Sequence, residues 1–151
     1  MPDIVTNPKA RRDYHLIETF EAGLVLKGTE VKALRAGRGQ LGDAYGLVQG
    51  GEVWLCNAHI DEYSHGNLHN HDPKSPRKLL LHKSEIRKLI GLAEIKGHAL
   101  VPLALYWKNG KVKVSLAVGK GKVQYDKRED LKRREAEREL KRATLHRFKG
   151  N

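Results

Sequence analysis

The sequence has little cysteine, few aromatic residues and no long apolar run. A single cysteine, Cys56, excludes a disulfide within the chain, and its apolar surroundings predict a buried, reduced thiol. No stretch approaches the roughly 20 apolar residues of a membrane-spanning helix. Residues 1–9 also lack the apolar core of a signal peptide. These absences predict a cytoplasmic protein without membrane association.

Positive charge is what the sequence has in excess. Its 29 Lys and Arg residues outnumber 18 Asp and Glu, which gives a formal net charge of +11 and attracts polyanions at long range. Nucleic acid is the first candidate partner. An anionic membrane surface is the competitor, but the basic C-terminal part lacks the Trp, Phe and Leu face of an interfacial helix. A chain of 151 residues allows one domain with a core, plus an appendage.

Alternating apolar residues predict several antiparallel strands between residues 14 and 119. Two such runs meet at Asn109-Gly110, a typical two-residue hairpin turn. The pairs predicted from this turn are Trp107 with Val112, Leu105 with Val114, Leu103 with Leu116 and Val101 with Val118. The opposite face of this hairpin carries Tyr106, Lys108, Lys111, Lys113 and Ser115.

Further strands and two helices are expected between residues 14 and 96. A second hairpin turns at Gly50-Gly51, and another strand is predicted at residues 77–81. The remaining strands are predicted at residues 14–20 and 24–27, joined by a turn at Glu21-Ala22-Gly23. The helices are predicted at residues 29–36, with Thr29 as N-cap, and at residues 83–96, after a His82–Glu85 capping box. Short strands of this kind hide their edges best in a closed barrel.

Catalytic chemistry is not visible in the sequence. Four histidines and two aspartates are of the residue types that bind metals, but their spacing is generic and a polar surface loop is the preferred interpretation. These residues are His59, Asp61, His65, His69, His71 and Asp72. A Cys56–His pair is disfavoured by the burial expected of Cys56, and no glycine-rich phosphate loop is present. We therefore predict no catalytic residue, no metal and no cofactor.

Basic residues give a better account of function. They are predicted to line one electropositive surface of the barrel, where they would contact phosphates. The set comprises Lys9, Arg11, Arg12, Lys32, Arg35, Arg38, Lys74, Arg77, Lys78, Lys83, Lys120, Lys122, Lys127 and Arg128. Glu21 and His82 could recognise a base edge or a 2′-hydroxyl, although Glu21 is equally readable as an exposed turn residue.

The C-terminal segment, residues 123–151, is basic and poor in apolar residues. Between residues 126 and 151 the large apolar residues are Leu131, Leu140, Leu145 and Phe148, too few and too irregularly spaced to form a core. Its Glu, Lys, Arg, Ala and Leu content nevertheless favours a helix. Two interpretations stay open on composition: a solvated charged tail, or a segment that becomes helical against a partner.

Several ordered strings resemble a known family. They are Ala10-Arg11-Arg12-Asp13-Tyr14, Phe20-Glu21-Ala22-Gly23, Gly28-Thr29-Glu30-Val31-Lys32-Ala33-Leu34-Arg35-Ala36-Gly37, His71-Asp72-Pro73, Arg77-Lys78-Leu79-Leu80-Leu81-His82, Leu105-Tyr106-Trp107-Lys108-Asn109-Gly110 and Tyr125-Asp126-Lys127-Arg128. Together they resemble the SsrA-binding protein (SmpB) family, the partners of transfer-messenger RNA in bacterial ribosome rescue. The resemblance runs from about Lys9 to Arg138.

The resemblance implies a mainly β fold: a small antiparallel OB-like β-barrel with two or three embedded helices and a basic C-terminal tail. Residues 1–122 would form the RNA-binding barrel. Residues 123–151 would be disordered when free and helical on the ribosome. The RNA-binding residues are expected to be Glu21, Arg11, Arg12, Arg35, Lys78, Leu80, His82, Lys83, Lys120 and Lys122. Residues for the ribosomal decoding centre and mRNA channel would be Tyr125, Asp126, Lys127, Arg128, Lys132, Arg133 and Arg134.

The resemblance also implies the partners. They would be transfer-messenger RNA, the stalled 70S ribosome including its 16S rRNA, and elongation factor Tu in the delivery complex. The protein would act as a monomer and catalyse no bond change itself. The alternative function is that of a general structured-RNA-binding or ribosome-associated protein.

Overall fold

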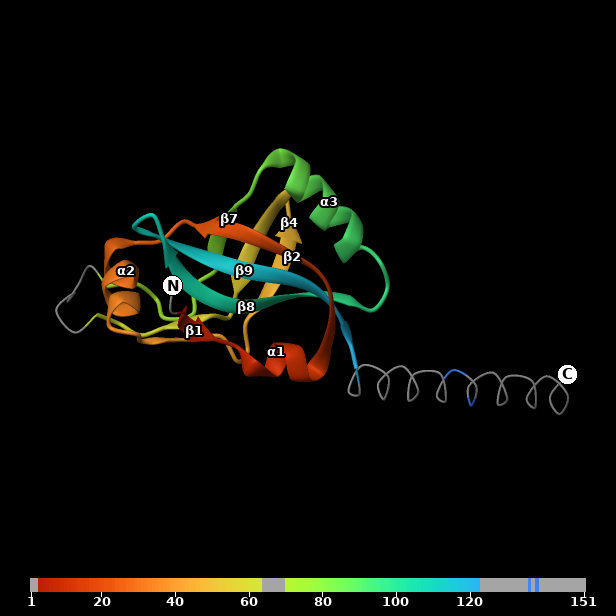
Figure 1. Cartoon of the computed structure of the whole chain (residues 1–151), viewed down its shortest axis with the longest axis horizontal. Coiled ribbons are helices and arrows are strands. Elements are labelled where there is room, and N and C mark those ends of the chain that lie inside the picture. The colour runs from red at the N-terminus through yellow and green to blue at the C-terminus, as the bar shows by residue number, and fades with distance from the viewer. Residues whose placement is uncertain (1–2, 64–69, 123–135, 137, 139–151) are drawn as a thin grey trace, which may run out of the picture.

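The computed structural model describes residues 3–63 and 70–122, together with Ala136 and Arg138 (Figure 1). The strands are β1 (Asp3–Thr6), β2 (Tyr14–Leu24), β3 (Gly39–Gln40), β4 (Tyr45–Gln49), β5 (Glu52–Cys56), β6 (His59–Ile60), β7 (Arg77–Leu80), β8 (His98–Lys108) and β9 (Lys111–Gly121). The helices are α1 (Pro8–Asp13), α2 (Gly28–Arg35) and α3 (Lys83–Ala93).

The strands close into a barrel-like ring. Their order is β1-β8-β4-β5-β7-β2-β9, and the pairing of β9 with β8 joins the two sides of the sheet. All of these pairings are antiparallel, and β3 and β6 form a separate small sheet. The predicted mainly β, antiparallel fold is confirmed, as a ring of strands rather than a regular barrel.

The apolar core fills this ring and extends under two helices. Leu55, Leu105 and Leu116 enter it from the strands, Leu34 from α2 and Leu89 from α3, and each is at most 1% exposed. Figure 1 shows α3 at one end of the sheet and α2 at the other. Cys56 is buried as predicted, and its burial raises the pKa of the thiol.

The β8–β9 hairpin confirms the turn and corrects part of the predicted register. Trp107 pairs with Val112 and Leu105 with Val114, as expected. Beyond them a β-bulge between Pro102 and Ala104 shifts the pairing, so the predictions for Leu103 and Val101 were wrong. Pro102 instead faces Leu116, and Leu100 faces Val118. A bulge adds one residue to one strand, which moves all later pairs by one position.

The predicted turn at Glu21-Ala22-Gly23 was wrong, because these residues continue a single strand. β2 runs without a break to Leu24 and pairs with β9 along most of its length. Ala22 is fully buried in the core, a position that a surface turn would not give it. Local sequence favoured a turn at glycine, but the long partner strand supplies backbone hydrogen bonds through this region.

The helices have caps that were only partly predicted. The backbone N–H of His82 donates to Glu85 Oε1 at 3.1 Å, which confirms the expected start of α3. The N-cap of α2 is Lys27 rather than Thr29, and the Lys27 backbone N–H donates to Glu30 Oε1 at 2.9 Å. The hydroxyl of Thr29 lies 2.8 Å from Nδ1 of buried His71 instead. α1 and β1 were missed, since both are short and neither shows an apolar period.

A buried ion pair joins α2 to β7. Arg77 Nε donates to Glu30 Oε2 at 2.5 Å, and both side chains are at most 3% exposed. The Arg77 guanidinium also donates to the carbonyls of Ala58 at 2.5 Å and Pro73 at 3.0 Å. Arg77 is therefore no part of an electropositive surface, contrary to the sequence-based expectation. It holds three segments of backbone together.

Removing this cation is expected to destabilise the fold strongly. Arg77→Met leaves the Glu30 carboxylate buried without a cation to balance its charge, which costs about 3–5 kcal/mol of unfolding free energy. Lys88→Met is the matched control, because it breaks an exposed pair of 2.6 Å with Glu18 and should cost less than about 1 kcal/mol. Urea denaturation of both variants measures the difference, and similar losses would contradict the structural role of Arg77.

Candidate nucleic-acid interface

A row of side chains crosses the outer face of the ring from β7 to β8. Strand pairing places Leu80 opposite Gly23, Gly23 opposite Lys113, and Lys113 opposite Tyr106. Directly opposed residues of antiparallel strands point to the same side of a sheet. Leu80 is 53% exposed, so this row presents an apolar side chain to solvent. We call this row, together with Glu21 and Lys108, the Glu21 face.

Glu21 is held in a fixed position on this face. It lies two residues before Gly23 on β2 and therefore points to the same side. The hydroxyl of Tyr106 donates to Glu21 Oε2 at 2.5 Å, and Lys108 Nζ donates to Oε1 at 2.9 Å. Glu21 is thus an exposed carboxylate clamped by two side chains of β8, and not a turn residue.

These contacts shift the pKa values of both partners. The hydrogen bond from Tyr106, followed by the one from Lys108, lowers the pKa of Glu21. Burial, followed by the hydrogen bond to Glu21, raises the pKa of Tyr106. At neutral pH the site therefore presents an ionised acceptor, Glu21, beside a phenol that keeps its proton.

Gly23 allows the close approach of neighbouring side chains. A Cβ at this position would lie 3.3 Å from Leu80 Cβ and 3.5 Å from Lys113 Nζ. An apolar side chain and a cation therefore sit against the backbone of β2, two residues from the Glu21 carboxylate. Such a combination can contact a base or sugar, a phosphate and a hydrogen-bond donor within one small area.

Other predicted RNA-binding residues lie around this face. Lys78, Leu80 and His82 alternate along β7 and the start of α3, with exposed Lys83 after them. Lys78 Nζ is paired with Glu52 at 2.9 Å, which partly neutralises it. Arg35, at the end of α2, lies over the ring of Trp107 at 5.8 Å. Tyr106 and Trp107 were not among the predicted site residues, although their place beside the Asn109-Gly110 turn was visible.

Four predicted residues form a second group at the opposite end of β2. Lys122 Nζ donates to the carbonyl of Arg11 at 3.1 Å, and Arg12 Nε lies 3.4 Å from Asp13 Oδ1. Lys120 is exposed and pairs across the strands with His15 and His98. We call these residues the α1 group. They lie near Tyr14, the first residue of β2, which is seven residues before Glu21 and roughly 20 Å from it along the strand.

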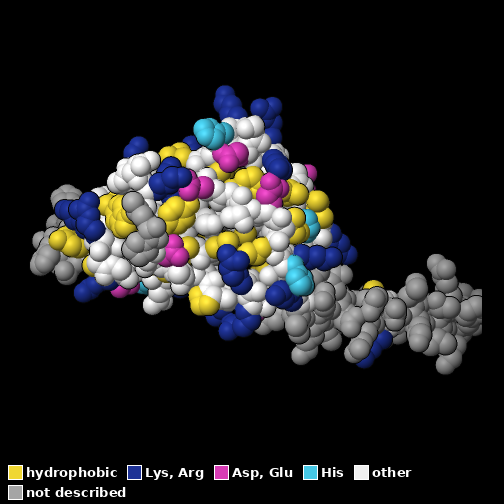
Figure 2. All heavy atoms as spheres, in the orientation of Figure 1, with side chains coloured by type: hydrophobic (Ala, Val, Ile, Leu, Met, Phe, Trp, Pro, Cys, Tyr) yellow, Lys and Arg dark blue, Asp and Glu magenta, His cyan; other side chains and the backbone are white. Residues whose placement is uncertain are grey.

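The single electropositive surface that the sequence predicted is therefore divided into two parts. Figure 2 shows Lys and Arg side chains in separate clusters, with Asp and Glu between them. The Glu21 face contains the acidic, apolar and aromatic residues, whereas the α1 group is mainly cationic. The Glu21 face thus combines several kinds of side chain, which selective recognition requires.

The histidine loop has structural roles where it is described. His59 Nε2 lies 2.8 Å from Asp61 Oδ1, and His71 Nε2 donates to the carbonyl of Ile60 at 2.9 Å. His65 and His69 lie outside the described residues. Within the described part of the chain, no group of three or more His, Cys, Asp or Glu could hold a metal. No helix in that part is long and apolar enough to cross a membrane.

The comparisons with known proteins identify the family. A family model described as SmpB protein matches residues 4–146. The chain belongs to the SmpB family. It is 57% identical over 140 residues to the SsrA-binding protein of Desulforudis audaxviator strain MP104C, covering 93% of this chain and 92% of that protein. It is 56% identical over 144 residues to the SsrA-binding protein of Bacillus subtilis strain 168, covering 95% and 92%.

The fold is also similar to that of a solved SmpB structure. The structure is described as "tmRNA-SmpB: a journey to the center of the bacterial ribosome". The match has a TM-score of 0.66 and 47% identity, and covers 78% of this chain and 82% of that chain. In this chain, the residues predicted to act in the decoding centre and mRNA channel run from Tyr125 to Arg134. They lie outside the described residues. Their role stays a prediction.

The Glu21–Tyr106 contact predicts a measurable coupling. Glu21→Gln removes the negative charge that favours the neutral phenol, so the pKa of Tyr106 should fall toward that of an ordinary tyrosine. Carbon NMR of the tyrosine rings, assigned with Tyr106→Phe, follows this titration. Glu18→Gln removes a carboxylate from the same strand outside the Glu21 face, and should leave the pKa of Tyr106 unchanged. If the pKa of Tyr106 is the same in both variants as in the wild type, the contact is disproved.

Proposed function

We propose that this chain binds the tRNA-like domain of transfer-messenger RNA and delivers it to stalled ribosomes in trans-translation. The observation that carries the proposal is the clamped Glu21 carboxylate beside Leu80 and Lys113, on the exposed face of a chain with a net charge of +11. The names of the relatives and of the similar structure support it, since they refer to SsrA binding, to tmRNA and to the bacterial ribosome.

The chemistry of the Glu21 face suits folded RNA. Its carboxylate accepts hydrogen bonds from a 2′-hydroxyl or a base N–H, which an all-phosphate contact would not need. Lys113 and Lys108 supply the positive charge that offsets the repulsion between Glu21 and the RNA backbone. Leu80 offers an apolar surface to an unstacked base or a sugar. Phosphate attraction gives affinity here, and the carboxylate gives selectivity.

A division of labour follows for the rest of the chain. Residues 1–122 hold the RNA, and residues 123–151 act in the ribosome, with Tyr125, Asp126, Lys127, Arg128, Lys132, Arg133 and Arg134 near the 16S rRNA of the decoding centre and mRNA channel. Elongation factor Tu joins the delivery complex, and the protein works in the cytoplasm as a monomer. It breaks or forms no bond itself, because its role is to place the RNA.

A general structured-RNA-binding function is the second candidate. The separated basic clusters favour it, because several cationic patches can hold many RNA shapes through phosphates alone. Competition separates the two functions. The labelled tRNA-like domain is bound first and competitor RNA is then added. If the first function is correct, bulk tRNA should displace it poorly. If the second is correct, bulk tRNA should displace it as well as the unlabelled domain does.

Glu21→Ala should weaken binding of the tRNA-like domain by about tenfold, because it removes a charged acceptor from a hydrogen bond. The slope of affinity against salt concentration should not fall, since Glu21 neutralises no phosphate. Glu18→Ala is the control, because it makes the same charge change on β2. Glu18 pairs with Lys88 outside the Glu21 face, so the affinity of this variant should stay near that of the wild type. Equal dissociation constants for the two variants would remove Glu21 from the interface.

Deleting residues 131–151 should leave RNA affinity unchanged and abolish peptide tagging. The described body, which carries both groups of candidate RNA-binding residues, is intact in this truncation. Binding is measured by gel shift with the tRNA-like domain, and tagging by translation of a message without a stop codon. Equal loss of both activities would contradict the division of labour.

A further inference from the structure

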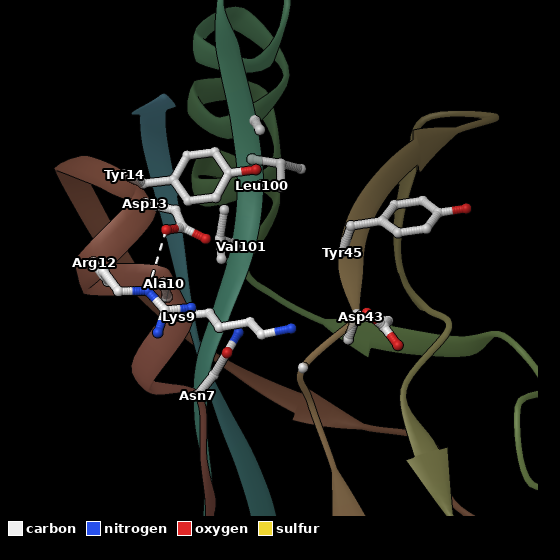
Figure 3. A pocket seen from close by; sticks show the side chains of 13 residues that line it. Asn7, Lys9, Ala10, Arg12, Asp13, Tyr14, Asp43, Tyr45, Leu100 and Val101 are labelled. Carbon is white, nitrogen blue, oxygen red and sulfur yellow. Dashed lines mark hydrogen bonds and ion pairs between the residues drawn. The ribbon is translucent and has the colours of Figure 1, made fainter. Parts of the chain in front are cut away.

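A pocket of about 770 Å³ lies between α1 and the start of β4 (Figure 3). Its lining residues come from three segments of the chain: α1 with its flanking residues, the loop before β4, and the beginning of β8. The pocket lies beside the α1 group, at the opposite end of β2 from Glu21. Of its lining residues, Lys9 and Arg12 alone were named above as candidate phosphate-binding residues.

Asn7 lies at the base of this pocket with one polar atom unused. Its backbone N–H donates to the carbonyl of Leu103 at 2.8 Å, and its Nδ2 donates to the carbonyl of Pro102 at 2.9 Å. These two bonds fix the orientation of the amide. Asn7 is 6% exposed, and among the described residues its Oδ1 has no hydrogen-bond donor. An asparagine at a helix N-cap ordinarily uses Oδ1 to accept a backbone N–H of the helix, but α1 has no such bond.

Charged groups of both signs surround this acceptor. Lys9 is exposed, and Figure 3 shows its side chain extending across the pocket above Asn7. Arg12 stands at the rim with its Nε 3.4 Å from Asp13 Oδ1. Asp43 faces them from the other side, where only its backbone carbonyl is engaged, by Asn57 Nδ2 at 3.1 Å. Within the described chain, Lys9 and the Asp43 carboxylate are free to bind a ligand.

Two tyrosines stand on opposite sides of the pocket in Figure 3. Tyr14 is held against β9, since a Cβ at Gly119 would lie only 3.0 Å from Tyr14 Cβ. Tyr45 is 49% exposed on β4. The Tyr14 ring points across the pocket and provides a stacking surface for a flat ligand, whereas Tyr45 bounds the other side with its ring pointing away from Tyr14.

We propose that this pocket takes the base of one unpaired RNA nucleotide. The acceptors Asn7 Oδ1 and Asp43 match the N–H groups on a base edge, the Tyr14 ring matches one of its faces, and Lys9 at the rim matches its phosphate. An arginine side chain from a protein partner would fit the acceptors and rings, but Lys9 and Arg12 would repel it. The inference rests on the proposed RNA-binding function and adds a nucleotide subsite distant from the Glu21 face.

NMR titration of the full chain with each of the four ribonucleoside 5′-monophosphates tests the subsite. At least one nucleotide, at millimolar concentration, should shift the side-chain amide signal of Asn7 in a saturable way. Tyr45→Ala should weaken that binding about tenfold, because it removes an aromatic side chain that bounds the pocket. Leu47→Ala is the matched control, since Leu47 is similarly exposed two residues farther along β4 and lies outside the pocket. It should bind as the wild type does.

Three results would overturn the proposal. These are an Asn7 signal that no nucleotide shifts, an equal shift with inorganic phosphate alone, and equal weakening by Tyr45→Ala and Leu47→Ala. An equal or stronger shift with an arginine-containing peptide would assign the pocket to a protein ligand instead. Binding of the tRNA-like domain is measured on the same samples. If the wild-type protein does not bind the tRNA-like domain, the proposed function is contradicted. If it binds that domain but no nucleotide shifts the Asn7 signal, only the subsite is contradicted.

Discussion

The pairing of β9 with both β2 and β8 is the constraint on which the rest of the structure depends. Each of these strands is eleven residues long, and β9 bonds to one neighbour along each edge. The shared strand closes the ring and places distant parts of the chain side by side. At one end it brings Glu21 of β2 within reach of Tyr106 and Lys108 of β8. At the other end it brings α1 to the beginning of β8.

The core and the buried ion pair make this arrangement rigid enough to carry recognition. Glu30 and Arg77 fix α2 and β7 to each other, and Arg35 of the same helix reaches the ring of Trp107. The strand that holds Arg77 ends at Leu80, beside Gly23. The position of the exposed leucine therefore follows from a buried charge pair three residues earlier. Rigid supports of this kind limit the entropy that a binding site loses when RNA is bound.

The sequence was most informative where local rules decide the structure. The Asn109-Gly110 turn, the alternation around it and the cap of α3 were predictable, because turn geometry and capping act over a few residues. The continuation of β2 through Gly23 was not, because it depends on a partner strand about ninety residues away. Glu21 was singled out from sequence, yet its clamp by Tyr106 required knowing that two strands share a neighbour. Arg77 was misplaced on the surface, since charge alone does not reveal a buried partner.

The β-bulge at Leu103 connects the failed register prediction with the pocket. The residues around it, Pro102 and Leu103, provide the two carbonyls that bind Asn7. The bond to the Leu103 carbonyl continues the register of β1 and β8, in which Thr6 faces Ala104, whereas the Pro102 carbonyl beside the bulge binds the Asn7 side chain. The Asn7 amide is thus turned away from its helix, and its Oδ1 is left unused. Local departures from regular structure are often found where a site is built, and here the bulge and the unused acceptor lie next to each other.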